Sequence, residues 1–128
     1  MPRVLVIDDQ SHVRAAITFA LRAKNFEVVA VESGPEGLRV FENSPFDLAI
    51  VDIFMPGMDG VKLIKSLRER SPKLPIVAIS GVLLRSSART ALDFLPLAPD
   101  LTDIICLQKP FRPNELMQAI QKAIAVDA

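Results

Sequence analysis

Acidic, hydroxyl and basic side chains follow four separate apolar runs in this chain. Asp8 and Asp9 come directly after VLVI, and Asp52 comes after FDLAIV. Ser80 follows LPIVAI, and Lys109 stands two residues beyond DIICL. Three carboxylates held together repel one another and raise the pKa of at least one of them, and a divalent cation relieves that repulsion. Oxygen ligands without histidine or cysteine suit Mg²⁺.

Together with the three acids, the lysine and the hydroxyl predict a site that handles a phosphoryl group. Transfer of a phosphoryl group depends mainly on positioning it and neutralising its oxygens, which a cation, Lys109 and Ser80 could do together. A carboxylate can itself accept the phosphoryl group. Asp52 is the best candidate for that role, because it is a solitary acid among apolar neighbours.

Each of these residues also has a simpler structural reading. Asp8 and Asp9 could cap a helix that begins near Ser11. Asp52 could be a turn residue, Ser80 an ordinary hydroxyl at the end of a strand, and Lys109 a solvated charge. The occurrence of all of them after apolar runs favours a shared site.

Five short apolar runs alternate with amphipathic stretches, which predicts strands that alternate with helices. The predicted strands are residues 4–7, 26–31, 46–51, 74–79 and 103–107. The predicted helices include apolar stripes from Val13 to Leu21, Gly60 to Leu67 and Leu116 to Ile124, and one after the capping-box pair Ser33 and Glu36. Pro113 suits a first helical turn. We therefore expect an α/β fold with an open, doubly wound (βα)5 sheet, whose ligands gather at the carboxyl ends of the strands.

The stretch from Val82 to Thr102 departs from this regular pattern. A helix is expected around Leu84–Leu95, and the prolines of PLAPDLTD should end it there. The connection to the last strand is then longer than usual.

Composition limits the class of protein. The chain has 128 residues, half of them apolar, and its 15 basic and 15 acidic side chains cancel. These totals predict one folded domain without the basic field expected of a nucleic-acid or lipid-surface binder. Cys106, the single cysteine, has no partner for an internal disulfide. No signal peptide or run of ~20 apolar residues is present, so we expect a cytoplasmic protein without a membrane role.

Four stretches in order, VLVIDD, DLAIVDIFMPGMDG, PIVAISG and KPF, resemble the receiver domain of bacterial two-component response regulators over essentially the whole chain. The resemblance implies a flavodoxin-like sheet of strand order 2-1-3-4-5. It implies that Asp8, Asp9, Asp52 and the backbone carbonyl of Phe54 hold Mg²⁺. Asp52 would accept a phosphoryl group from the phosphohistidine of a sensor histidine kinase or histidine phosphotransferase. Ser80 would be the switch hydroxyl and Lys109 the phosphoryl contact, before a cis Pro110.

The expected protein is a stand-alone receiver over residues 1–128 with no output domain. It would not be an enzyme toward other molecules, but a phosphoacceptor that assists its own phosphorylation and slow dephosphorylation in a phosphorelay. It would signal through an unidentified protein target, and a homodimer is one open mode of assembly.

The sequence departs from the family pattern at three places. Cys106 stands where the family usually has a switch aromatic, so that switch cannot operate. The segment between Ser80 and Lys109 is longer than usual. Five of its apolar residues are either core or a partner surface; they are Leu83, Leu84, Phe94, Leu95 and Leu97. Phe54 and Val82, both apolar, stand where the family controls the hydrolytic water, so we predict slow self-dephosphorylation.

Three rival functions stay open. A phosphoryl shuttle or sink would move phosphate between kinases without an effector. A binding module that does not need phosphorylation would keep the pocket, and Cys106 is the feature that favours it. A phosphohydrolase would want a second acid two residues after its nucleophile, and Phe54 at that place argues against it.

Overall fold

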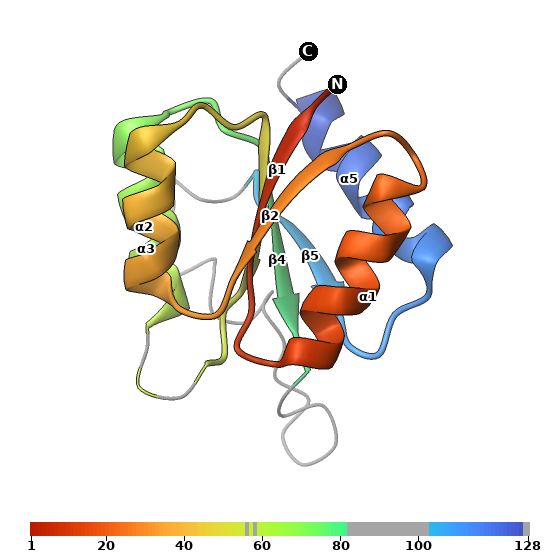
Figure 1. Ribbon diagram of the computed structural model, residues 1–128. Helices are drawn as coiled ribbons and strands as arrows, with labels where there is room; N and C mark the ends of the chain where they lie inside the picture. Colours follow the sequence, from red (N-terminus) through yellow and green to blue (C-terminus); the bar gives the residue numbers. More distant parts are fainter. Residues whose placement is uncertain (56, 58, 82–102, 127–128) are drawn as a thin grey trace.

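Five parallel strands form the centre of the molecule. The computed structural model describes residues 1–55, 57, 59–81 and 103–126 (Figure 1). The strands are β1 (Arg3–Ile7), β2 (Glu27–Val31), β3 (Leu48–Asp52), β4 (Ile76–Ser80) and β5 (Ile105–Gln108). They pair in the order β2-β1-β3-β4-β5, and every neighbouring pair is parallel. The expected doubly wound, flavodoxin-like order is confirmed.

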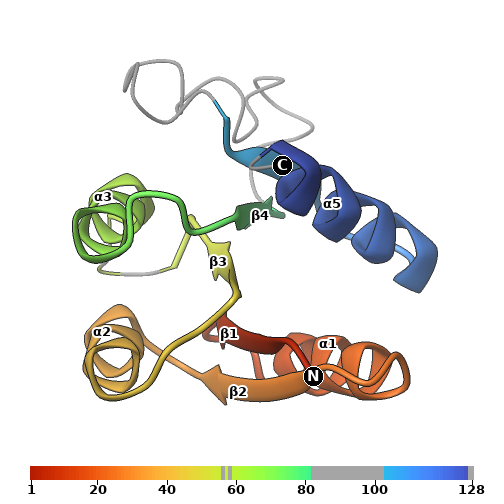
Figure 2. The ribbon, with the colours of Figure 1, turned by 90° about the horizontal axis from the view of Figure 1, so that it is seen from above.

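Helices cover both faces of this sheet. Within the described part of the chain they are α1 (Ser11–Arg22), α2 (Gly34–Asn43), α3 (Gly60–Arg70) and α5 (Pro113–Val126). Figure 2 shows α1 and α5 on one face of the sheet and α2 and α3 on the other. None of these four helices is long and apolar enough to cross a bilayer. The helix expected around Leu84–Leu95 lies outside the described residues.

Burial on both faces explains why the strands read as unbroken apolar runs. In β1, Val4 and Val6 belong to the core under α1 and α5, whereas Leu5 and Ile7 belong to the core under α2 and α3. All four side chains are fully buried. Because successive side chains of a strand point to opposite faces, a sheet covered on both sides needs an apolar residue at every position.

The predicted helix starts are found, with one difference in detail. Ser33 accepts a hydrogen bond from the Glu36 amide at 3.3 Å, and Pro113 is the first residue of α5. The Glu36 carboxylate accepts from the amide of Glu32, whereas the capping box predicted the amide of Ser33. Asp59 caps α3 by accepting from the amides of Val61 and Lys62.

Strand register fixes which side chains reach the carboxyl edge. Asp52 is aligned with Ile79 of β4, and Ser80 is aligned with Gln108 of β5. Beyond the strands, the Lys109 amide donates to the Ser80 carbonyl at 2.7 Å, and the Asp8 amide donates to the Val31 carbonyl at 3.1 Å. The strand ends therefore continue to pair past their last residues, which holds the edge residues in place.

Candidate functional site

The structure brings all five predicted side chains to one edge of the sheet. Asp8 and Asp9 follow β1, Asp52 ends β3, Ser80 ends β4 and Lys109 follows β5. Asp8, Asp52 and Ser80 are buried, with exposed fractions of 0%, 3% and 2%. Parallel strands place their carboxyl ends at the same edge, so residues far apart in sequence meet there.

Three carboxylates form a cluster at this edge. One oxygen from each of Asp8, Asp9 and Asp52 lies within 4.8 Å of the other two. Asp8 Oδ2 is buried and receives no well-aligned hydrogen bond within the described chain. Its described contact is an ion pair with Lys109. Two buried acids and one exposed acid, all offering oxygen, fit a hard divalent cation that keeps some of its water.

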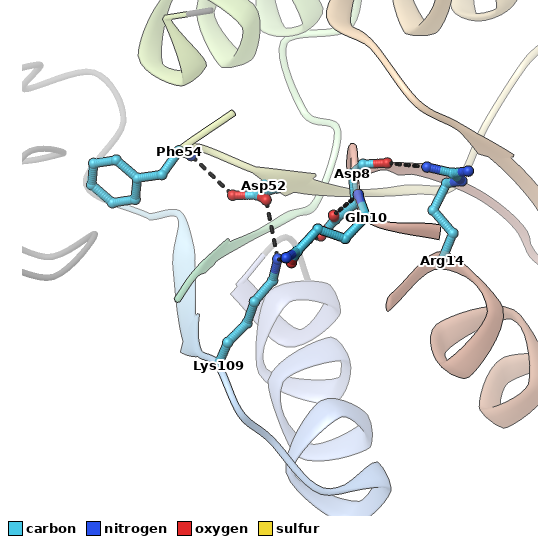
Figure 3. Close-up of polar contacts among 6 residues, drawn as sticks. All are labelled: Asp8, Gln10, Arg14, Asp52, Phe54 and Lys109. Carbon is cyan, nitrogen blue, oxygen red and sulfur yellow. Dashed lines mark hydrogen bonds and ion pairs between the residues drawn. The ribbon is translucent and has the colours of Figure 1, made fainter. Parts of the chain in front are cut away.

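Lys109 holds the two buried acids together. Its Nζ lies 2.9 Å from Asp8 Oδ2 and 3.1 Å from Asp52 Oδ2, and it donates to Gln10 Oε1 at 2.9 Å (Figure 3). Burial by itself would lower the pKa of Lys109. The close contact with Asp8 and the charge of Asp52 outweigh that effect and raise the pKa, so the side chain stays an ammonium.

The surroundings of Asp52 have opposing effects on the pKa of its carboxyl group. Burial raises its pKa, although the amide of Phe54 and the ammonium of Lys109 both favour the ionised form. The Phe54 amide donates to Asp52 Oδ1 at 2.9 Å, and Lys109 binds the other oxygen. A further positive charge beside Asp52 would favour its ionised, nucleophilic form.

Asp8 is held by the turn that leads into α1. Its Oδ1 accepts from the amide of Gln10 at 2.8 Å, and its backbone carbonyl accepts from Arg14 Nη1 at 2.9 Å. The residue at the N-cap of α1 is Gln10, so the alternative that Asp8 or Asp9 caps this helix is wrong. The sequence reasoning missed both Gln10 and Arg14. A glutamine at a helix start, where shorter polar residues are preferred, draws attention to Gln10, but it does not predict which residue Gln10 contacts.

Ser80 carries a buried hydroxyl whose Oγ has no hydrogen-bond partner in the described part of the chain. Its backbone is tied to Lys109, which precedes a cis peptide bond to Pro110, as expected. A buried hydroxyl without a partner costs free energy. Ser80 therefore carries a donor that no described residue uses.

An open cavity of about 620 Å³ adjoins the carboxylate of Asp52. Its lining includes Asp9, Gln10, Asp52, Phe54 and Lys109. Figure 3 shows the ring of Phe54 pointing away from the carboxylates of Asp8 and Asp52. The predicted role of the Phe54 carbonyl as a metal ligand stays a prediction, and Val82 lies outside the described residues.

Cys106 lies in β5 and packs against the core under α2 and α3. It is half-buried, and burial raises the pKa of its thiol from 9.0 to about 11. This position therefore holds a neutral thiol where the family usually has a switch aromatic, as the sequence indicates. The five apolar residues predicted as core or partner surface, between residues 83 and 97, lie outside the described residues.

Comparison with known proteins identifies the family to which this chain is similar. The model of the response regulator receiver domain matches residues 4–121. The chain is 32% identical to the sensory transduction protein RegX3 of Mycolicibacterium smegmatis, over 97% of this chain and 51% of that protein. It is 29% identical to the DNA-binding transcriptional regulator NtrC of Escherichia coli K12, over 95% of this chain and 24% of that protein.

A solved structure agrees in fold. The chemotaxis protein CheY4 of Vibrio cholerae superposes with a TM-score of 0.83 at 26% identity, covering 96% of this chain and 98% of that one. The chain spans about half or less of the length of the two curated relatives, so their whole activities do not transfer to it. The family match and the acid cluster lead to the same conclusion: the chain belongs to the response regulator receiver domains of two-component signalling.

Proposed function

We propose that this receiver accepts a phosphoryl group on Asp52 from the phosphohistidine of a sensor histidine kinase or histidine phosphotransferase, in a reaction that needs Mg²⁺. The observation that carries the proposal is the bridge by Lys109 Nζ between the buried carboxylates of Asp8 and Asp52. Asp9, exposed beside them, completes a set of three carboxylates that opens to a cavity.

The transfer of the phosphoryl group is a displacement at phosphorus. An oxygen of Asp52 forms a bond to phosphorus while the bond from phosphorus to the donor's imidazole nitrogen breaks. The electron pair of the broken bond stays on the imidazole, which then takes up a proton. The product is an acyl phosphate on Asp52, and attack by water on its phosphorus would return the carboxylate and release inorganic phosphate.

Each residue of the site has its own role in the proposed transfer. Lys109 neutralises charge on the phosphoryl oxygens, and its position 3.1 Å from Asp52 Oδ2 supports that role. Ser80 donates its hydroxyl to a phosphoryl oxygen, a role supported by its buried Oγ, which has no hydrogen-bond partner among the described residues. Asp8, Asp9, Asp52 and the Phe54 carbonyl would hold Mg²⁺. Bound there, the cation would supply further neutralisation of the phosphoryl oxygens.

The central experiment is incubation with a small phosphodonor such as phosphoramidate, with Mg²⁺ or with EDTA, read by intact mass. Wild type is expected to gain one phosphoryl group only with Mg²⁺, whereas Asp52→Asn gains none. Glu69→Gln, a change at an exposed acid of α3, serves as the matched control and should behave as wild type. Lys109→Ala should fold and react at least about tenfold more slowly, because it loses a charge-assisted contact.

A result without a phosphoryl adduct on wild type under either condition would overturn the proposal. It would favour the alternative of a binding module that acts without phosphorylation. Return of the phosphoryl group to a histidine phosphotransferase would instead favour the shuttle or sink role within the same chemistry.

The proposal extends to how the domain passes on its signal. We infer that it signals through a protein partner and assists its own slow dephosphorylation, without acting as an enzyme on other molecules. A cytoplasmic location stays a prediction. Action as a stand-alone protein also stays a prediction, because the curated relatives are longer than this chain. The mass of the native protein would test the stand-alone state.

A further inference from the structure

Gln10 contacts the ammonium group of the candidate site. Its Oε1 accepts a hydrogen bond from Lys109 Nζ at 2.9 Å, although the two residues are 99 positions apart in sequence. Gln10 is exposed and lines the cavity that also includes Asp52. The glutamine carbonyl therefore approaches Lys109 at the open cavity from which a phosphodonor must also approach.

The position of Gln10 in its helix makes this contact informative. Gln10 is the N-cap of α1, and its side chain makes no capping hydrogen bond. Ser33 and Asp59 occupy the same position in α2 and α3, and both side chains do cap. Helix starts favour residues that cap, so a side chain used elsewhere at this position indicates another role.

The three partners of Lys109 are not equivalent. Its ammonium has three N–H groups, and its described partners are oxygens of Asp8, Asp52 and Gln10. Asp8 and Asp52 are buried carboxylates, whereas Gln10 is neutral and exposed. Hydrogen bonds between two charged groups are stronger than those to a neutral carbonyl. Gln10 is thus the partner that an arriving anion displaces most easily.

We propose that Gln10 is a positioning residue whose carbonyl occupies the place on Lys109 that a phosphoryl oxygen takes. This inference rests on the proposed function. When a phosphodonor enters the cavity, the neutral hydrogen bond to Gln10 is exchanged for a charge-assisted bond to a phosphoryl oxygen. No covalent bond changes in this exchange. Gln10 keeps the ammonium in place before phosphorylation and sets how readily it is released to the donor.

Three substitutions at Gln10 separate positioning from stability. Gln10→Ala removes the competing carbonyl, so phosphorylation by phosphoramidate should become about two- to tenfold faster, the range of one neutral hydrogen bond. Gln10→Asn is one methylene shorter and suits an N-cap, so it should raise the melting temperature and accelerate phosphorylation like alanine. Gln10→Glu offers an anion to Lys109 and should slow the reaction.

A matched control removes the effect of charge alone. Ser11→Glu adds the same charge at the next, exposed residue, which does not line the cavity. Gln10→Glu should therefore slow phosphorylation by at least about threefold more than Ser11→Glu, because only the former contacts Lys109. Equal slowing by the two variants overturns the inference, and so does slower reaction of both Gln10→Ala and Gln10→Asn.

A second readout does not depend on phosphorylation. Acetic anhydride should acetylate Lys109 faster in Gln10→Ala than in wild type, because one of its three partners is gone, while exposed Lys65 should react equally in both. If wild type takes up no phosphoryl group, the proposed function fails, and the acetylation of Lys109 then decides the inference about Gln10 separately. An unchanged acetylation rate of Lys109 overturns it.

Discussion

Gly60 packs against the backbone of Ile53 so closely that a methyl group on Gly60 would overlap the α-carbon and carbonyl oxygen of Ile53. Gly60 is the first residue of α3, and Ile53 directly follows Asp52. The absence of a side chain at Gly60 therefore lets α3 begin directly beside the segment that carries the candidate phosphoacceptor.

Gly60→Ala should lower the free energy of unfolding by about 1–3 kcal/mol, because the overlap is with backbone that cannot move freely. Gly37→Ala is the matched comparison, since its added methyl would meet side-chain atoms of Ile7 and not backbone. The gain in helix propensity, up to about 1 kcal/mol, should offset much of its cost. Urea denaturation of both variants checks this, and equal losses would contradict the backbone argument.

Mg²⁺ should raise the melting temperature of the wild-type protein, because a ligand that binds only the folded state stabilises it. At a free concentration a hundred times the dissociation constant, the gain is about 2.7 kcal/mol. Asp8→Asn should abolish most of the shift, and Glu69→Gln should keep it. Thermal unfolding with Mg²⁺ and with EDTA provides the measurement. A shift that persists in Asp8→Asn would place the cation elsewhere.

The lifetime of the acyl phosphate tests the role of Phe54. An apolar side chain can neither donate to nor accept from a hydrolytic water, so Phe54→Asn should shorten the half-life several-fold, about two- to tenfold for one new hydrogen bond. Because the ring points away from Asp52, Phe54→Leu should leave the half-life unchanged (Figure 3). A shorter half-life in both variants would support shielding by the ring, and no change in Phe54→Asn would end the idea that this position matters. Loss of the phosphoryl group over time, followed by intact mass, gives the half-lives.

Cys106 should react slowly with iodoacetamide at pH 8, because the thiolate is the nucleophile and burial raises the pKa of this thiol from 9.0 to about 11. Two pH units correspond to a thiolate fraction that is roughly a hundredfold smaller in the folded than in the unfolded protein. The rate should rise with pH up to about 11. Alkylation of the native and the urea-unfolded protein at the same pH checks the prediction, and equal rates would contradict it.

The pair Arg68–Asp103 should stabilise the fold more than the pair Arg70–Glu42. Arg68 makes two hydrogen bonds to Asp103, of 2.8 and 3.2 Å, and donates to the Leu74 carbonyl. Its side chain is 13% exposed, whereas that of Arg70 is 38% exposed. Double-mutant cycles should give a coupling of about 1–2 kcal/mol for the first pair and below about 1 kcal/mol for the second. Equal couplings would show that solvent screens both pairs alike.

The fold could be predicted from local patterns because its causes are local. A sheet covered on both faces requires continuous apolar strands, and those runs mark β1 to β5 in the sequence. Parallel strands also carry whatever follows them to one edge, so Asp8, Asp52, Ser80 and Lys109 could be assigned to a common site. The start of α2 directly after Ser33 and of α5 at Pro113 followed from capping and proline chemistry.

The sequence by itself determined which residue types reach the edge of the sheet, whereas only the tertiary structure decided which atoms meet there. Lys109 contacts Asp52 across 57 positions of sequence and Gln10 across 99. No periodicity or motif in the sequence predicts the Gln10 contact, nor the direction of the Phe54 ring. Both depend on how α1 and the loop after β3 pack on the sheet, because a side chain's partner is set by three-dimensional distance once the core has fixed the backbone.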